Sequence, residues 1–176
     1  RFESTATDSD KPLTSLDEYL ERASEDQDTI WYLTADSPEA ARGNPHLEAF
    51  RKRDIEVLLL GDRIDEWMVS HLDEYRGKPL KSAARATPPG LDEAREAAED
   101  DQAVLDRLKQ LLDNEVEAVK PSARLVDSPA CLVLPEHGIS PHMQRLLKQA
   151  GQEMPAPQAT LEVNLDHPLF QRLKNQ

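Results

Sequence analysis

The first half of the chain alternates short apolar runs with amphipathic stretches, a pattern that predicts an α/β layer. Residues 29–35 and 55–61 are rich in β-branched, aromatic or aliphatic side chains, and both are predicted to be strands. Residues 13–23 carry apolar side chains at helical spacing, with Ser15 as the expected N-cap. The second strand is apolar on both faces, which is typical of a central parallel strand covered by helices. Residues 1–82 are therefore expected to be a small α/β subdomain containing a parallel βαβ layer.

Polar residues mark where the helices of this half begin. Ser37 and Asn44 each precede a proline, which is typical of an N-cap followed by the first helical position. Asp62 follows the second strand and is expected to cap the next helix. Asp65, three residues further on, is its partner in a weak capping box.

The helix that follows the second strand carries Trp67, one of two tryptophans. At about 100° per residue, Ile64, Met68 and Leu72 fall into one stripe that is expected to be buried, and Trp67 lies on its shoulder. Two interpretations stay open. The periodicity favours a ring that folds over the edge of the core, whereas an exposed ring would be a contact platform for another molecule. Trp31, within the first strand, is expected to be buried.

The second half, residues 92–176, is predicted to be a truncated α+β subdomain. Residues 91–116 form one long helical pattern, acidic and alanine-rich at first and apolar later. Short strands are expected after it, at residues 116–120, 130–134 and 159–164. The segment 77–90, rich in proline and glycine, marks the boundary between the halves, and residues 83–91 are assigned to a linker.

An amphipathic helix is predicted between the last two strands. Ser140 is its expected N-cap, a proline follows, and Gly151 is its C-terminal stop. The apolar stripe, with the residue before the cap, contains Ile139, Met143, Leu146 and Leu147. This stripe either docks on its own sheet, the usual arrangement for a short helix, or is exposed as an adaptable contact surface.

Charge and composition narrow the classes of function. The net charge of −13 argues against binding to nucleic acid or to an anionic membrane surface, because nothing would neutralise the partner's charge. No apolar run reaches the roughly 18 residues that a membrane helix needs. The single cysteine, Cys131, excludes an internal disulfide and fits a reducing compartment.

The sequence contains no motif that specifies catalysis, a cofactor or a metal. The Gly-Lys pair at 77–78 lacks a preceding glycine turn, and Pro79 would break the helix that a phosphate loop opens. No serine has the flanking glycines of a nucleophile elbow. The five histidines do not converge with a cysteine pair at zinc spacing. Cys131 lies in an apolar strand, where cysteine is more often inert, and its pairing with a histidine is left open.

Several stretches resemble the heat shock protein 90 chaperones, in their bacterial form. The stretches that match in order through the first 80 residues are RFEST (1–5), SLDEYLER (15–22), IWYLTADSPEAA (30–41), NPHLEAFRKRDIEVLLLGDRIDEWM (44–68) and GKPL (77–80). The match continues more loosely through RLVDSPACLV (124–133), the helix from Ser140 and LEVNLDHPLFQRL (161–173). The resemblance therefore covers nearly the whole chain.

The resemblance implies that residues 1–82 are the end of the family's middle domain and residues 92–176 most of its C-terminal domain. The ATP-binding domain and the arginine that contacts the terminal phosphate would lie upstream, so this chain is expected to bind neither ATP nor Mg. The full-length parent is expected to be a cytoplasmic, homodimeric ATPase. The dimerisation helices would follow Gln176, which leaves dimerisation of this chain open. The start at Arg1, without a methionine, agrees with a fragment.

The resemblance also implies two regions of contact with client proteins. The first is matched by Glu66, Trp67 and Ser70, although many bacterial relatives have asparagine in place of Ser70. The second is matched by Ile139, Met143, Leu146 and Leu147. The resemblance therefore favours the exposed interpretation for Trp67 and for the later helix.

We predict that the chain binds non-native or partly folded client proteins through exposed apolar side chains, with co-chaperones as further partners. The alternative is a structural coupling module that transmits conformational change without touching a client. Exposure of Trp67 to solvent separates these two hypotheses.

Overall fold

The computed structural model describes residues 1–8, 13–91, 93–113, 115–135, 151 and 158–175. The chain divides into two compact units, residues 1–91 and residues 92–176. We call them unit 1 and unit 2 and describe each by itself.

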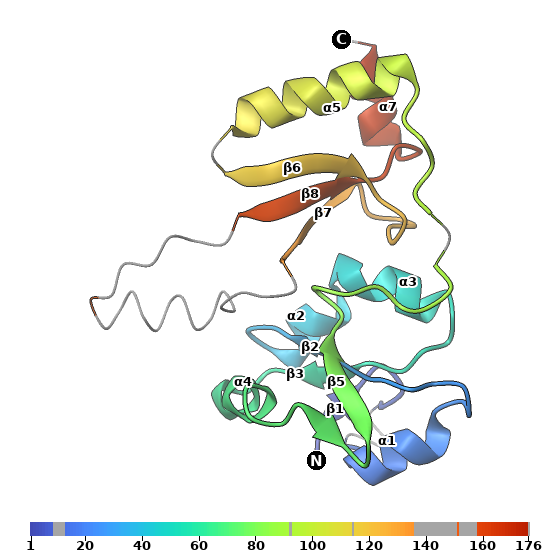
Figure 1. Cartoon of the computed structure of the whole chain (residues 1–176), viewed down its shortest axis with the longest axis vertical. Helices are drawn as coiled ribbons and strands as arrows, with labels where there is room; N and C mark the ends of the chain where they lie inside the picture. The colour runs from blue at the N-terminus through green and yellow to red at the C-terminus, as the bar shows by residue number, and fades with distance from the viewer. Residues whose placement is uncertain (9–12, 92, 114, 136–150, 152–157, 176) are drawn as a thin grey trace. The chain divides into compact units, whose positions relative to one another are not determined.

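Unit 1 is built on a five-stranded mixed sheet with the strand order β1-β3-β2-β5-β4 (Figure 1). Its strands are β1 (Glu3–Ser4), β2 (Ile30–Thr34), β3 (Leu58–Leu60), β4 (Glu74–Tyr75) and β5 (Lys78–Ser82). The central strand β2 pairs in parallel with β3 and with β5, whereas β1 and β4 are antiparallel to their neighbours. The strands predicted at 29–35 and 55–61 are therefore present as β2 and β3, each shorter than predicted.

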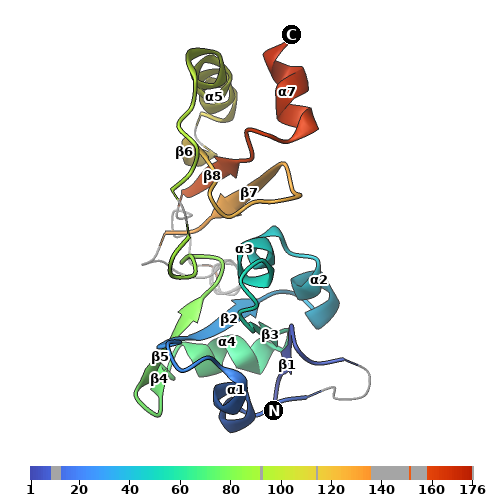
Figure 2. The same cartoon turned by 90° about the vertical axis from the view of Figure 1, so that its right-hand side faces the viewer.

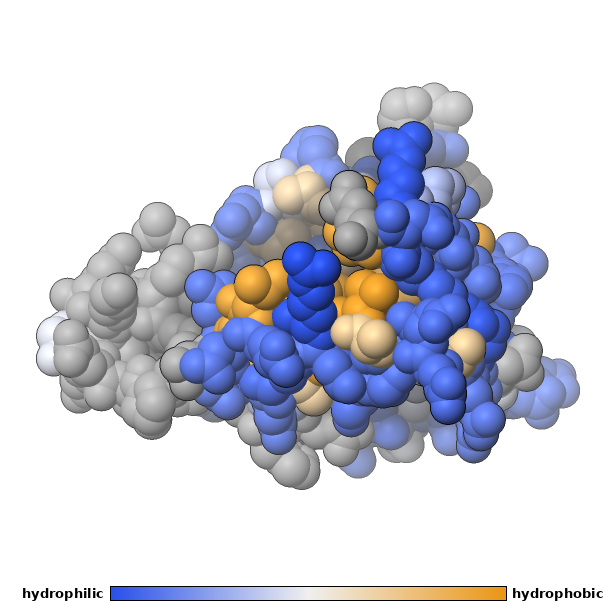
Figure 3. All heavy atoms as spheres, turned by 90° about the horizontal axis from the view of Figure 1, so that it is seen from above, coloured by the Kyte–Doolittle hydropathy of each residue, from blue (hydrophilic) through white to orange (hydrophobic). Residues whose placement is uncertain are grey.

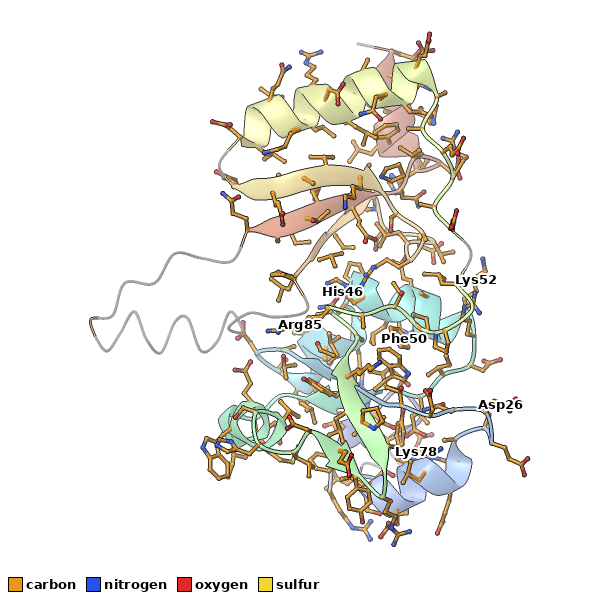
Figure 4. The ribbon with its side chains drawn as sticks, in the orientation of Figure 1. Asp26, His46, Phe50, Lys52, Lys78 and Arg85 are labelled. Carbon is orange, nitrogen blue, oxygen red and sulfur yellow. The ribbon has the colours of Figure 1, made fainter. Side chains whose placement is uncertain are left out.

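Helices cover both faces of this sheet (Figure 2). They are α1 (Leu16–Arg22), α2 (Pro38–Arg42), the 3-10 helix η1 (Pro45–Leu47), α3 (Glu48–Arg51) and α4 (Arg63–Val69). Successive strand residues point to opposite faces. Leu59 therefore packs with Phe50 of α3, which points toward the sheet in Figure 4, while Leu58 and Leu60 pack with Tyr19 of α1 on the other face.

The N-caps predicted from the sequence are present at the starts of three of these helices. The Ser15 hydroxyl accepts a hydrogen bond from the backbone N–H of Glu18 at 3.2 Å, and the Glu18 carboxylate accepts one from the Ser15 N–H at 2.8 Å. The side chains of Ser37 and Asn44 accept from backbone N–H groups at the starts of α2 and η1. Each cap satisfies a backbone donor that has no partner within its helix.

Unit 2 contains a three-stranded sheet in the order β6-β8-β7. Its elements are α5 (Glu99–Leu112), β6 (Val116–Pro121), β7 (Ala130–Val133), β8 (Ala159–Val163) and α7 (Pro168–Lys174). β8 is parallel to β6 and antiparallel to β7. Leu105 of α5 and Phe170 of α7 share one core with Val163 of β8, so both helices pack on this sheet.

The long helix predicted over 91–116 is wrong at its start, residues 91–98, because α5 begins only at Glu99. The side chain of Asp101, in the first turn, accepts a hydrogen bond from the backbone N–H of Ala98 at 3.2 Å. The same buried carboxylate pairs with Lys174 at 2.7 Å and Arg95 at 3.1 Å. This tertiary ion pair sets the start of the helix, against the helix propensity of the alanines and glutamates before it.

The proline-rich segment 77–90 belongs to unit 1 in the structure. Its first residues form β5, and Ala83 is fully buried in the same core as Trp31. Arg53 donates to the backbone carbonyl of Pro89 at 3.3 Å. The boundary between the compact units therefore lies after Leu91.

A candidate contact surface on helix α4

The turn from β3 into α4 fixes where the helix starts. A Cβ atom on Gly61 would lie 2.5 Å from Cδ of Pro38, so this position accepts no side chain without a shift. The carboxylate of Asp65 accepts a hydrogen bond from the backbone N–H of Asp62 at 3.0 Å, as the capping-box pattern predicts. Burial raises the pKa of the Asp65 carboxyl, and the Asp62 backbone bond partly opposes that rise.

The exposed face of α4 differs from the prediction. Met68 and Val69 pack against the core around Tyr19, whereas Ile64 is 69% exposed and Trp67 is 61% exposed. The predicted stripe of Ile64, Met68 and Leu72 is therefore wrong at Ile64. Docking through Met68 and Val69 turns the buried stripe by about 50°, which places Trp67 nearly opposite the core.

Two residues further along the chain contact Trp67, His71 at its ring and its carbonyl oxygen and Ser70 at the carbonyl oxygen alone. The ring of His71 lies against the indole with centroids 4.5 Å apart and planes tilted by 35°. The Ser70 hydroxyl donates to the Trp67 carbonyl oxygen at 2.7 Å, and His71 Nδ1 lies 2.9 Å from that oxygen. A carbonyl oxygen only accepts, so Nδ1 carries the hydrogen of this bond.

Trp31 provides the contrast within unit 1. It is 3% exposed, and its ring meets that of Phe50 edge-on with centroids 4.9 Å apart. Its predicted burial is therefore confirmed. Of the two tryptophans, one completes a core and the other faces solvent.

The structure places the first predicted contact region and does not cover the second. Glu66 is half-buried, and its carbonyl oxygen accepts from the backbone N–H of Ser70 at 3.1 Å on the same helix as Trp67. The second region, namely Ile139, Met143, Leu146 and Leu147, lies outside the described residues. Ile64 and His71 join Trp67 on the exposed face, although neither was assigned to the site. Their spacing from Trp67, three residues before and four after, is the signal that could have found them.

A second exposed apolar area lies between α5 and α7 of unit 2. It is a groove of about 340 Å³, and Figure 3 shows apolar side chains gathered on this face among polar ones. Leu108 and Leu111 of α5 line it together with Leu173 of α7, and Leu111 is 74% exposed. Because this groove is a second exposed apolar surface, binding assigned to α4 has to be tested against binding in the groove.

The described part of the chain offers no metal centre. No three histidine, cysteine, aspartate or glutamate side chains among the described residues are grouped to hold an ion. His46 is buried beside α3, and the ring of the half-buried His167 caps α7 by accepting from the backbone N–H of Leu169. Within the same described residues, no helix has the length and apolar character to cross a membrane.

Comparison with known proteins identifies the class of protein. The family model described as Hsp90 protein matches residues 1–176, so the chain belongs to the Hsp90 family of chaperones. Among individual relatives, it is 52% identical to the chaperone protein HtpG of Alcanivorax borkumensis and 49% identical to that of Methylococcus capsulatus. It is 48% identical to the chaperone protein HtpG of Alkalilimnicola ehrlichii. The resemblance stated from the sequence is confirmed.

The match covers all of this chain but only part of each relative. The alignments include 98–100% of the chain and 28–29% of the three HtpG proteins. The chain therefore spans a little over a quarter of the length of the relatives that it matches.

Proposed function

We propose that this chain is a client-binding part of an ATP-dependent chaperone and that it holds non-native proteins through exposed apolar side chains. The observation that carries the proposal is the 61% exposed indole of Trp67, on the face of α4 turned away from the core. A large rigid ring offers contact area at low conformational cost. The His71 ring lies against this exposed indole, which is therefore suited to contact with another molecule rather than to packing in its own core.

Binding through such a surface is weak and exchangeable. Burial of one large apolar side chain contributes about 1.5–3 kcal/mol, and the ordering of the partner offsets part of that gain. A few contacts of this size let a client bind and leave. This agrees with the membership of the Hsp90 family and with the name chaperone that the relatives carry.

The parent protein supplies the rest of the cycle in this proposal. Residues 1–91, which form unit 1, are the end of a middle domain, and residues 92–176 are most of a C-terminal domain; the segment 83–91, expected to be a linker, packs with unit 1. ATP and Mg bind to segments outside this chain, and the full-length protein works as a cytoplasmic homodimer with co-chaperones. The family membership and the coverage of about 28% of the relatives support this arrangement.

Aggregation of a reduced, unfolding client in the presence of the chain tests the proposal. Trp67→Ala is expected to weaken the protection of the client by about 1–2 kcal/mol in apparent affinity, as for the central residue of a contact surface. Leu13→Ala is the matched control, because Leu13 is another partly exposed apolar residue of unit 1, at 47%. Circular dichroism of each variant verifies that the fold is retained.

Three results would decide between the hypotheses. Weakened protection in Trp67→Ala alone supports client contact through α4. Full protection in Trp67→Ala, with loss in Leu111→Ser, would transfer the contact to the groove between α5 and α7. Full protection in both folded variants would favour the coupling module that touches no client.

A further inference from the structure

The exposed side of α4 presents a second large apolar side chain, Ile64, besides the indole of Trp67. Ile64 and Trp67 lie three residues apart on α4, and His71, in the turn that follows the helix, places its ring against Trp67. All three are exposed, and the rings of Trp67 and His71 lie against each other at a tilt of 35°. We call these three residues the α4 patch.

The stretch of sequence that carries the α4 patch is rich in negative charge. Residues 62–74 contain five carboxylates and one arginine. Asp73 and Glu74, which follow the end of the helix, are exposed. The next cation along the chain, Arg76, already pairs with Asp17 at 2.9 Å. A partner that reaches the patch therefore meets apolar rings within a negative field.

We propose that the α4 patch selects apolar segments of non-native protein that are flanked by lysine or arginine. This inference rests on the proposed function and names the class of client segment that the same site prefers. The apolar side chain of the client packs on Ile64 and Trp67, and its cation meets Asp73 and Glu74. A cation that lies on the open part of the indole gains a further attraction from the ring.

The charge distribution argues against a second copy of this chain as the occupant. A two-fold contact through the α4 patch would bring together two copies of the same acidic stretch, residues 62–74. Like charges in contact are unfavourable, and the whole chain carries a net charge of −13. A cationic apolar segment removes this repulsion, whereas a second copy doubles it.

Three labelled peptides test the selection. They share one core of leucine and phenylalanine, and the core is flanked by lysines, by serines or by glutamates. Fluorescence anisotropy with the whole chain measures their dissociation constants at low and at high salt. The lysine peptide is expected to bind tightest and the glutamate peptide weakest, and salt should reduce the difference because it screens exposed charges.

Variants separate the apolar part of the surface from its charged border. Asp73→Asn with Glu74→Gln is expected to reduce the preference for lysine over glutamate flanks by about two- to tenfold, as for two exposed ion pairs. Glu25→Gln with Asp26→Asn is the matched control and should leave the preference unchanged. It removes the same charge from a turn that Figure 4 places on the opposite side of unit 1 from α4. Ile64→Ser should weaken all three peptides by a similar factor.

The variants at Trp67 and at Asp73 and Glu74 distinguish a loss of selection from a loss of client contact. If Trp67→Ala weakens every peptide while the Asp73 and Glu74 variant keeps the full preference, the selection is overturned and the client contact stands. An equal loss of preference in the Glu25 and Asp26 control would assign it to net charge and would also overturn the selection. If Trp67→Ala changes the binding of no peptide, both the selection for cationic flanks and the client contact through α4 are overturned. Self-association that Ile64→Ser abolishes would instead identify a second copy as the occupant.

Discussion

At the scale of single residues, Tyr19 joins three parts of unit 1 through one hydroxyl. The group donates to the backbone carbonyl of Glu56 at 2.8 Å and accepts from the Gln27 side chain at 2.9 Å. It also accepts from the backbone N–H of Trp31 at 3.1 Å, at the start of the central strand. Burial raises the pKa of the Tyr19 hydroxyl to about 12, so it stays neutral under ordinary conditions.

Replacing Tyr19 by phenylalanine removes that hydroxyl and keeps the ring. We predict a loss of about 1–3 kcal/mol in the free energy of unfolding of unit 1, because two backbone groups and one amide lose a partner away from water. Urea unfolding followed by tryptophan fluorescence measures the loss. Tyr32→Phe is the control, since the Tyr32 hydroxyl makes none of these three bonds, and an equal loss in both variants would contradict the assignment.

At the scale of elements, the close approach of the β3–α4 turn to α2 determines how α4 leaves the sheet. Gly61 faces the ring and the backbone nitrogen of Pro38, so a methyl group at Gly61 forces the two elements apart. We predict that Gly61→Ala destabilises unit 1 by about 1–3 kcal/mol, the usual cost of overpacking. Gly43→Ala is the matched control, because a Cβ atom on Gly43 meets nothing within 4 Å. Thermal unfolding of the two variants compares them directly, and equal stability would show that the turn relaxes freely.

The ion pair between α5 and α7 gives unit 2 a dependence on acid. The ammonium of Lys174, with the Ala98 N–H and Arg95, holds the pKa of the buried Asp101 carboxyl below its usual value. A lowered folded pKa means that Asp101 stabilises unit 2 fully above the unfolded pKa and loses that contribution as the pH falls through the folded pKa. Stability should therefore decline below about pH 3.8, the ordinary value for an aspartate.

Asp101→Asn tests this dependence. We predict a loss of about 1–3 kcal/mol at neutral pH and a flatter acid profile of unfolding, because the charge that binds Lys174 and Arg95 is gone. Far-ultraviolet circular dichroism across the acid range measures both effects. Asp100→Asn removes the same charge from an exposed neighbour on α5 and should leave the profile steep. A steep profile in Asp101→Asn itself would show that other carboxylates control the acid response.

At the scale of the whole molecule, the two units have separate cores and different spectroscopic probes. Both tryptophans lie in unit 1, whereas the core of Leu105, Val163 and Phe170 belongs to unit 2. Tryptophan fluorescence therefore reports the unfolding of unit 1, and circular dichroism reports both units. A variant that weakens client binding can therefore be checked for the stability of unit 1 by fluorescence and for the stability of both units by circular dichroism.

We predict that the same variants act on different transitions. Gly61→Ala should shift the unfolding transition seen by fluorescence, and Asp101→Asn should shift only the part of the circular dichroism signal that fluorescence does not follow. Variants in separate cores act independently when they share no partners. Equal shifts of both signals in both variants would mean that the chain unfolds as one cooperative whole.

The sequence by itself determined much of the local structure. The caps at Ser15, Ser37 and Asn44 are local, because a side chain and a backbone donor two or three residues away are enough to form them. The strand β3 could be predicted from its apolar run alone, without knowledge of the strands that pair with it. The stretches that match in order along the chain were enough to identify the family.

Only the tertiary structure decided which way α4 and α5 present their side chains. Periodicity gives the angle between residues but not the angle at which a helix docks, and the docking of Met68 and Val69 left Ile64 in solvent. The start of α5 likewise depends on Lys174, more than 70 residues away, which pairs with Asp101. A stripe on a short helix is ambiguous by a fraction of a turn, and long-range ion pairs leave no trace in local spacing. For this reason the exposed face beside Trp67 could be hypothesised from the sequence but located only in the fold.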